Sequence, residues 1–165
     1  MLVSKVRKGF STVEILVAVA LVAILMVVAV PRLLDSRKTV SDSSAKQQLN
    51  TVLVAVNNFF AERDTYDGIT VAELQTRLPE VELVATTAAT GKGSGGRALK
   101  VSVGATATEV IIAASNGDEN CWAIKVNTSG TKYAGAKAAA TACNATGVSG
   151  FAWQDFEFPN IDEAA

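Results

Sequence analysis

Apolar positions are distributed very unevenly along this chain. An unbroken run of sixteen apolar residues extends from Ile15 to Val30, and one carboxylate, Glu14, stands immediately before it. Residues 10–34 together hold 25 positions, of which only Glu14 and Arg32 are charged. About 20 apolar residues are enough for a helix to cross a bilayer. The pattern therefore predicts a helix that meets either lipid or a protein core, with a glutamate near its start.

A second helical pattern follows Pro31. Apolar side chains recur there at spacings of three and four residues, which is typical of a helix with one buried face. They are Leu49, Val52, Leu53, Val56, Phe59 and Phe60. Proline removes a backbone donor and bends a helix without having to end it. We expect one kinked helix from about residue 11 to about residue 63, roughly 80 Å long at 1.5 Å per residue, whose second half packs on a globular domain.

The rest of the chain predicts a short helix and then β-structure. Thr70 and Glu73 form a capping-box pattern, which opens a helix that ends before Pro79. Residues 80–89 are ambiguous, and the glycine-rich stretch 91–96 is typical of a turn.

Three segments show strand patterns, and short turn signals follow the second and the third. The strands are expected at residues 99–103, 109–114 and 121–126, with turns at 116–117 and 127–130. Strands joined by short turns favour an antiparallel sheet. We therefore predict an α+β fold in which a long kinked N-terminal helix packs on an antiparallel β-sheet.

Four aromatic residues lie close together near the C-terminus. They are Phe151, Trp153, Phe156 and Phe158. We expect them to form a last strand or a clamp on the core. The alternative is a contact surface for another subunit or a ligand, because exposed aromatic side chains mark interfaces.

Charge and composition argue against several classes of function. The chain has 15 basic residues, 16 acidic residues and no histidine. It shows no nucleophile with a partner base and no cluster of metal ligands, so we expect neither an enzyme, nor a cofactor, nor a metal site. Three of the basic residues, Lys5, Arg7 and Lys8, precede the apolar run. No other basic cluster could follow a phosphate backbone, so direct binding of nucleic acid is not expected.

The basic residues before the apolar run also predict an orientation. Under the positive-inside rule the N-terminus lies in the cytoplasm and the bulk of the chain lies outside. The two cysteines, Cys121 and Cys143, would then occupy an oxidising compartment, which favours a disulfide over two buried thiols. A disulfide between these cysteines, which are 22 positions apart, would stabilise the fold by about 3 kcal/mol.

Neither a secretory signal peptide nor a plain transmembrane anchor accounts for the whole N-terminal sequence. A secretory signal peptide needs a small-residue cleavage site, but the run ends in Val28-Ala29-Val30 followed by Pro31. A plain transmembrane anchor satisfies the length but not Glu14, because a carboxylate near the membrane core is costly and usually functional.

The segment Lys8-Gly9-Phe10-Ser11-Thr12-Val13-Glu14, with the apolar run and Pro31 behind it, resembles the signal of a type IV prepilin. The resemblance implies that a prepilin peptidase cleaves between Gly9 and Phe10 and then methylates the new amine of Phe10. It also implies three parts: a leader at 1–9, a hydrophobic transmembrane and assembly helix at 10–34, and a periplasmic or extracellular globular pilin domain at 35–165.

The same resemblance implies a role for Glu14. In a bundle of apolar helices, Glu14 of one subunit would pair with the Phe10 amine of a neighbour, since each charge alone would cost several kcal/mol to bury. Such a pair would also set the axial register, as a buried polar residue does in a coiled coil.

The resemblance implies a structural subunit of a type IV pilus that supports adhesion, motility or DNA uptake. Its expected partners are other pilin subunits, the peptidase and methyltransferase, the pilus assembly platform, and the inner membrane before assembly. The expected location is the inner membrane for the precursor and the cell surface for the assembled filament. Alternatives are a minor pilin, a pseudopilin of a type II secretion system, and a monomeric membrane-anchored domain.

Overall fold

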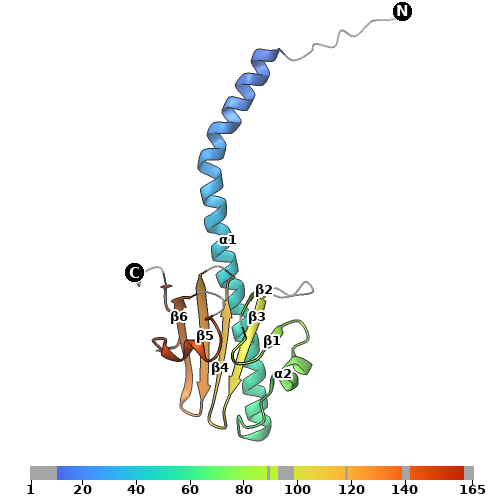
Figure 1. Cartoon of the computed structure of the whole chain (residues 1–165), viewed down its shortest axis with the longest axis vertical. Coiled ribbons are helices and arrows are strands. Elements are labelled where there is room, and N and C mark those ends of the chain that lie inside the picture. Colours follow the sequence, from blue (N-terminus) through green and yellow to red (C-terminus); the bar gives the residue numbers. More distant parts are fainter. Residues whose placement is uncertain (1–10, 89, 93–98, 118, 139–141, 162–165) are drawn as a thin grey trace, which may run out of the picture. The chain divides into compact units, whose positions relative to one another are not determined.

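The computed structural model describes residues 11–88, 90–92, 99–117, 119–138 and 142–161. The chain forms two compact units, one up to Arg37 and one from Lys38 onward, and the second is called the globular unit. Among the described residues the elements are one long α-helix, one short α-helix, a 3₁₀ helix at Gly147–Gly150 and a mostly antiparallel sheet (Figure 1). The expected α+β class is therefore confirmed.

The long helix, α1, runs from Thr12 to Arg63. Its backbone remains helical across Pro31, and the bend expected there stays a prediction. The helix ends where Asp64 adopts the left-handed conformation, with φ of 55°. The Asp64 N–H donates to the Phe60 carbonyl oxygen at 2.7 Å, so one of the last carbonyls of the helix finds a partner. This end lies within one residue of the end that the apolar spacing predicts.

The short helix, α2, runs from Val71 to Arg77 and begins at the predicted cap. The Thr70 Oγ1 accepts a hydrogen bond from the Glu73 N–H at 3.2 Å. The Glu73 carboxylate contacts Arg63 and Arg77 at 3.6 and 3.5 Å. Thr70 thus caps α2, while Glu73 connects it to the end of α1.

The sheet has the strand order β1-β3-β4-β5-β6-β7, and β2 pairs with β3 beside β1. Its strands are β1 (Glu82–Val84), β2 (Gly91–Lys92), β3 (Leu99–Ala105), β4 (Glu109–Ser115), β5 (Asn120–Asn127), β6 (Gly130–Lys137) and β7 (Gln154–Asp155). The three predicted strands correspond to β3, β4 and β5. The expected turns, one between β4 and β5 and one after β5, contain Gly117 and Gly130, whose φ angles of 89° and 136° suit glycine.

Three details of the sheet differ from the sequence prediction. Strand β6 (Gly130–Lys137) lies where the sequence analysis predicts no strand. Strand β1, from the ambiguous stretch, runs parallel to β3, so the sheet is not purely antiparallel. Gly91 and Lys92, expected within a turn, pair with Lys100 and Leu99 as β2. Such short strands carry too little periodicity to be recognised, and their pairing depends on the neighbouring strand.

The main core lies between the second half of α1 and one face of the sheet. The predicted stripe is buried at Leu49, Val52, Val56 and Phe59, whereas Leu53 and Phe60 are only partly buried. Successive residues of β5 point to opposite faces of the sheet. Its Trp122, Ile124 and Val126 join this core. Its Cys121 and Ala123 join a second, smaller cluster with Cys143 and Val148.

Candidate assembly surface and the contacts that support the domain

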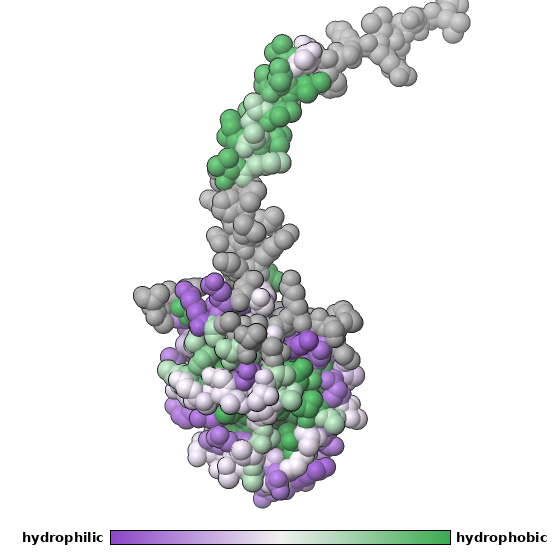
Figure 2. Space-filling view, viewed as in Figure 1, coloured by the Kyte–Doolittle hydropathy of each residue, from purple (hydrophilic) through white to green (hydrophobic). Residues whose placement is uncertain are grey.

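The first part of α1 exposes its apolar side chains all round. Between Val13 and Val27 the large hydrophobic residues are 49% to 76% exposed. Figure 2 shows this stretch as almost uniformly hydrophobic, whereas hydrophilic residues are scattered over the globular unit. A helix that is apolar on every side belongs in a protein core or in lipid. The segment therefore needs a partner that covers it.

Glu14 is the acidic residue in the first turn of α1. It borders a shallow depression whose other lining residues are Ile15, Ala18, Val19 and Val22. Among the residues that the structure describes, Glu14 forms no salt bridge. It therefore combines an exposed position, a favourable place near the positive end of the helix dipole, and apolar neighbours.

Gly9 and Phe10 lie outside the described residues. Cleavage between them, methylation of Phe10 and pairing of its amine with Glu14 therefore remain predictions. In the described part of the chain, no helix has a stretch long and apolar enough to cross a membrane.

A polar network connects α1 near Asp42, where the helix enters the globular unit, to the turn between β4 and β5 and to the start of β5. The Asp42 carboxylate accepts hydrogen bonds from Asn116 Nδ2 at 2.8 Å, Asn120 Nδ2 at 2.9 Å and Trp122 Nε1 at 3.2 Å. The Ser41 hydroxyl donates to the Asn116 carbonyl oxygen at 2.7 Å. Hydrogen bonds to a charged acceptor are about twice as strong as neutral ones. We call these five residues, together with Lys46 described below, the Asp42 network.

Sequence reasoning missed the Asp42 network. The available signal was an Asn-Gly turn flanked by amides and acids, which by itself indicates only a polar turn. The partner carboxylate lies 74 to 80 positions earlier in the chain, and no local pattern connects the two. The network is completed by Lys46, whose Nζ lies 3.8 Å from the centroid of the Trp122 ring.

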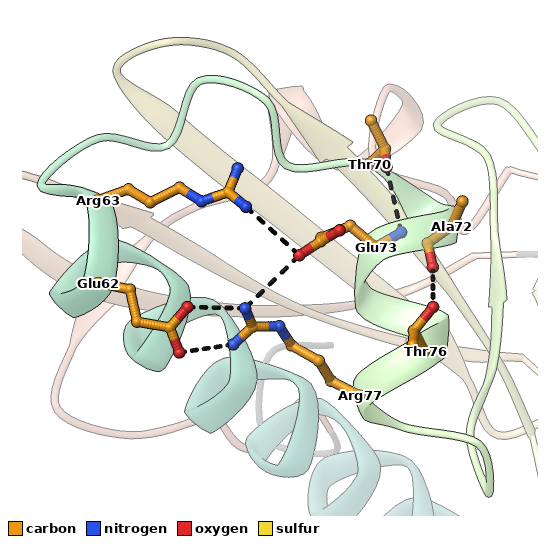
Figure 3. A network of polar contacts seen from close by, with 7 residues as sticks. All are labelled: Glu62, Arg63, Thr70, Ala72, Glu73, Thr76 and Arg77. Carbon is orange, nitrogen blue, oxygen red and sulfur yellow. Dashed lines mark hydrogen bonds and ion pairs between the residues drawn. The ribbon is translucent and has the colours of Figure 1, made fainter.

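A second network joins the end of α1 to α2 (Figure 3). Arg77 donates to both carboxylate oxygens of Glu62, at 2.9 and 2.7 Å. This hydrogen-bonded pair lowers the pKa of the Glu62 carboxyl below its ordinary value and raises the pKa of Arg77. The Glu73 carboxylate lies between Arg63 and Arg77. Opposite charges thus hold α2 in place on the last turn of α1.

Cys121 and Cys143 form a disulfide, which is the pairing expected from the sequence. Both residues are fully buried on the sheet face that lies away from α1. The Thr90 hydroxyl donates to the Cys143 carbonyl oxygen. The disulfide and this hydrogen bond connect the C-terminal region to two distant parts of the domain.

The C-terminal aromatic residues divide into two groups. Phe158 packs edge-on against Trp122 and Tyr133, with ring centroids 5.8 and 5.0 Å away. Phe151 and Trp153 pack against the smaller cluster. These three form the clamp that the sequence suggests. Phe156 does not, because its side chain is 94% exposed.

The described residues contain no group of three or more histidine, cysteine, aspartate or glutamate side chains that could hold a metal ion. The arrangement instead consists of an exposed apolar helical segment and a domain fastened by polar networks and a disulfide. Such an arrangement can support association between chains.

Comparison with known proteins gives one similarity of sequence. No family model matches the chain, and no solved structure matches it. The chain is 32% identical over 60 residues to the type IV major pilin protein PilA of Myxococcus xanthus. The matched stretch covers 36% of this chain and 27% of that protein. The chain is therefore similar to a type IV pilin over about a third of its length.

Proposed function

We propose that this protein is a structural subunit of a type IV pilus that polymerises through the first part of α1. The observation that carries the proposal is the exposed apolar surface from Ile15 to Val27, which Glu14 immediately precedes. Burying apolar surface stabilises an assembly by roughly 25 cal/mol per Å². Helices from several copies would cover one another's apolar surface. The partial similarity to a type IV major pilin supports the same role.

The proposed maturation begins with cleavage between Gly9 and Phe10 by a prepilin peptidase. The same enzyme methylates the Phe10 amine. The new amine then pairs with Glu14 of a neighbouring subunit, so that both charges are neutralised inside the apolar bundle. Apolar burial drives assembly, and the charge pair sets how far one helix is displaced along the next.

The precursor would lie in the inner membrane with its N-terminus inside, and the assembly platform would add it to the filament. The second unit of the chain, from Lys38 onward, would form the outer surface of the filament. Adhesion, motility or DNA uptake would then be properties of the filament. A domain fastened by a disulfide and polar networks suits this exposed position.

Mass spectrometry of the protein from its native host tests the maturation step. We expect a mature chain of about 156 residues that begins with N-methylated Phe10, as residues 1–9 are removed from 165. An intact Met1, or cleavage at another position, would contradict the proposal.

Electron microscopy of sheared surface material, with antibodies to the globular unit, tests polymerisation. We expect labelled filaments along their whole length. Label confined to filament tips would indicate a minor pilin, and label confined to the periplasm would indicate a pseudopilin. A processed protein that stays monomeric would refute a filament role.

A further inference from the structure

Phe156 combines two properties that seldom occur together. Its side chain is 94% exposed, and its backbone has a φ of 80°. Glycine or asparagine would suit that conformation better than a bulky side chain. The Phe156 ring also packs in neither of the two hydrophobic clusters. Strain of this kind persists where the surrounding structure imposes it and often marks a functional position.

The chain around Phe156 is held firmly on both sides. Before it, Gln154 and Asp155 pair with β6 as strand β7, and the Asp155 carboxylate accepts a hydrogen bond from Lys132 Nζ at 2.9 Å. After it, Phe158 is packed on the core. The backbone of the turn is therefore held in place on both sides, while the Phe156 ring points into solvent.

Exposed apolar side chains are rare on the described part of the globular unit. Among its described large hydrophobic residues only Val40, Val54 and Phe156 are more than half exposed, and the two valines lie on α1. Val54 borders a groove between α1 and α2. Its other lining residues are Thr51, Ala55, Asn58, Arg77 and Leu78. This set, with Val54, is called the α1–α2 groove.

The α1–α2 groove suits an aromatic ring. Val54, Ala55 and Leu78 supply apolar walls, and Arg77 supplies a guanidinium group of the kind that stacks on aromatic faces. The two hydrogen bonds from Arg77 to Glu62 hold one side of the groove in position (Figure 3). No charged residue occurs between Gln47 and Ala61, so this face of α1 can be covered without burying an unpaired charge.

Phe156 and the α1–α2 groove belong to opposite edges of the sheet. Phe156 directly follows β7, which is the last strand of the order, whereas α2 packs beside β1, which is the first (Figure 1). A contact between two different surfaces on opposite edges joins copies head to tail and can continue without closing. One subunit could therefore offer its ring to one neighbour and its groove to another.

We propose that Phe156 inserts into the α1–α2 groove of a second copy of this chain and so links neighbouring globular units. This inference rests on the proposed function, since it adds a lateral contact to a filament built by the first part of α1. The ring would lie against Val54 and Leu78 and beside Arg77.

Cysteine cross-linking in the full-length protein, purified in detergent and in any filaments, tests the contact. The variant carries Phe156→Cys together with Val54→Cys. We expect a ladder of dimers, trimers and larger species on a non-reducing gel. The matched control is Phe156→Cys with Val40→Cys, because Val40 is exposed on the same helix but lies about 21 Å away along its axis. It should give at most a trace of the ladder.

Two results would overturn the inference. One is the absence of a ladder with the Val54 variant, and the other is an equal ladder with the Val40 variant. Dimers alone from Phe156→Cys would indicate a symmetric contact between two rings, which also contradicts it. Mass analysis after digestion shows whether Cys121 and Cys143 have kept their own disulfide.

A second measurement uses single substitutions. Phe156→Ser should shorten filaments or reduce their yield several-fold, and Phe156→Trp should restore them. Thermal unfolding of the globular unit should be unchanged or slightly improved in Phe156→Ser, because the ring has no place in the core. Normal filaments from Phe156→Ser would refute the lateral contact but leave the proposed function intact. A ladder in detergent without any filaments would support the contact and refute the proposed function.

Discussion

The two halves of α1 differ both in apolar content and in what surrounds their side chains. From Val13 to Val27 the large apolar side chains are 49% to 76% exposed. From Ala45 to Phe59 a stripe of the same helix is completely buried. The second half has a stripe because a sheet covers only one of its faces, and its other face is polar. The first half is apolar all round, which suits burial from every side. The comparison indicates that the second half belongs to the fold and the first half to association.

The sharpest test of this difference is at Glu14. Glu14→Ala should abolish filaments while the protein still reaches the membrane fraction, because only the proposed intersubunit charge pair is lost. Glu14→Asp keeps the carboxylate and should retain part of the assembly. Electron microscopy and membrane fractionation measure the two effects. Wild-type filament numbers in Glu14→Ala would show that the carboxylate has no part in association.

A matched pair of truncations compares the two halves directly. Phe59→Ala removes a fully buried ring and should lower the free energy of unfolding by about 3–5 kcal/mol. Leu16→Ala removes a side chain that is 65% exposed and should leave domain stability unchanged. Both tryptophans lie after residue 38, so denaturant titration followed by tryptophan fluorescence reports on the globular unit alone. Equal losses in the two variants would mean that the halves are not independent.

The disulfide should affect only the globular unit. Replacing Cys121 and Cys143 together by alanine removes a cross-link across 22 positions and should cost about 3 kcal/mol of unfolding free energy. The same titration, with and without reductant, measures this loss. Reductant should destabilise the wild type but not the double variant. A wild type that is indifferent to full reduction would contradict a stabilising role.

The Asp42 network should determine how firmly α1 is held where it joins the sheet. Asp42→Ala leaves the donors of Asn116, Asn120 and Trp122 without their acceptor and should cost about 1–3 kcal/mol. Hydrogen exchange should rise first in the α1 amides near Asp42. Asp67→Ala is the control, because Asp67 is an exposed carboxylate in a loop. Exchange that rises equally in both variants would argue against a local fastening.

The smallest effect is expected from pH at the α1–α2 network. The Arg77 hydrogen bonds lower the pKa of Glu62 in the folded state below its ordinary value near 4.5. The folded protein therefore binds this proton less readily than the unfolded chain does. The Glu62–Arg77 pair therefore stabilises the fold above pH 4.5, and this stabilisation is lost as the pH falls through the lowered pKa of Glu62 in the folded protein. Glu62→Gln should remove this part of the acid dependence, which thermal unfolding at pH 3 to 7 can measure. An unchanged acid dependence would show that Glu62 does not contribute.

The strongest sequence patterns correspond to elements that the structure contains. The apolar spacing predicts α1 almost to its last residue, the Thr70 cap predicts the start of α2, and alternation or a short apolar run predicts β3, β4 and β5. Each depends on a local, repeated signal. Strand β6 follows a turn where the sequence predicts no strand, and β1 and β2 are only three and two residues long. They form because a neighbouring strand offers free backbone groups, which is information that a local pattern does not contain.

The sequence by itself determined that α1 is long, that its first part is apolar all round and that Glu14 precedes that part. These properties follow from residue order and helical periodicity alone. Only the tertiary structure decided that Asp42 meets Asn116, Asn120 and Trp122, that Arg77 faces Glu62, and that Phe156 alone among the C-terminal aromatics stays outside. The physical reason is that each of these outcomes depends on groups far apart in the chain, which the folding of the sheet brings together.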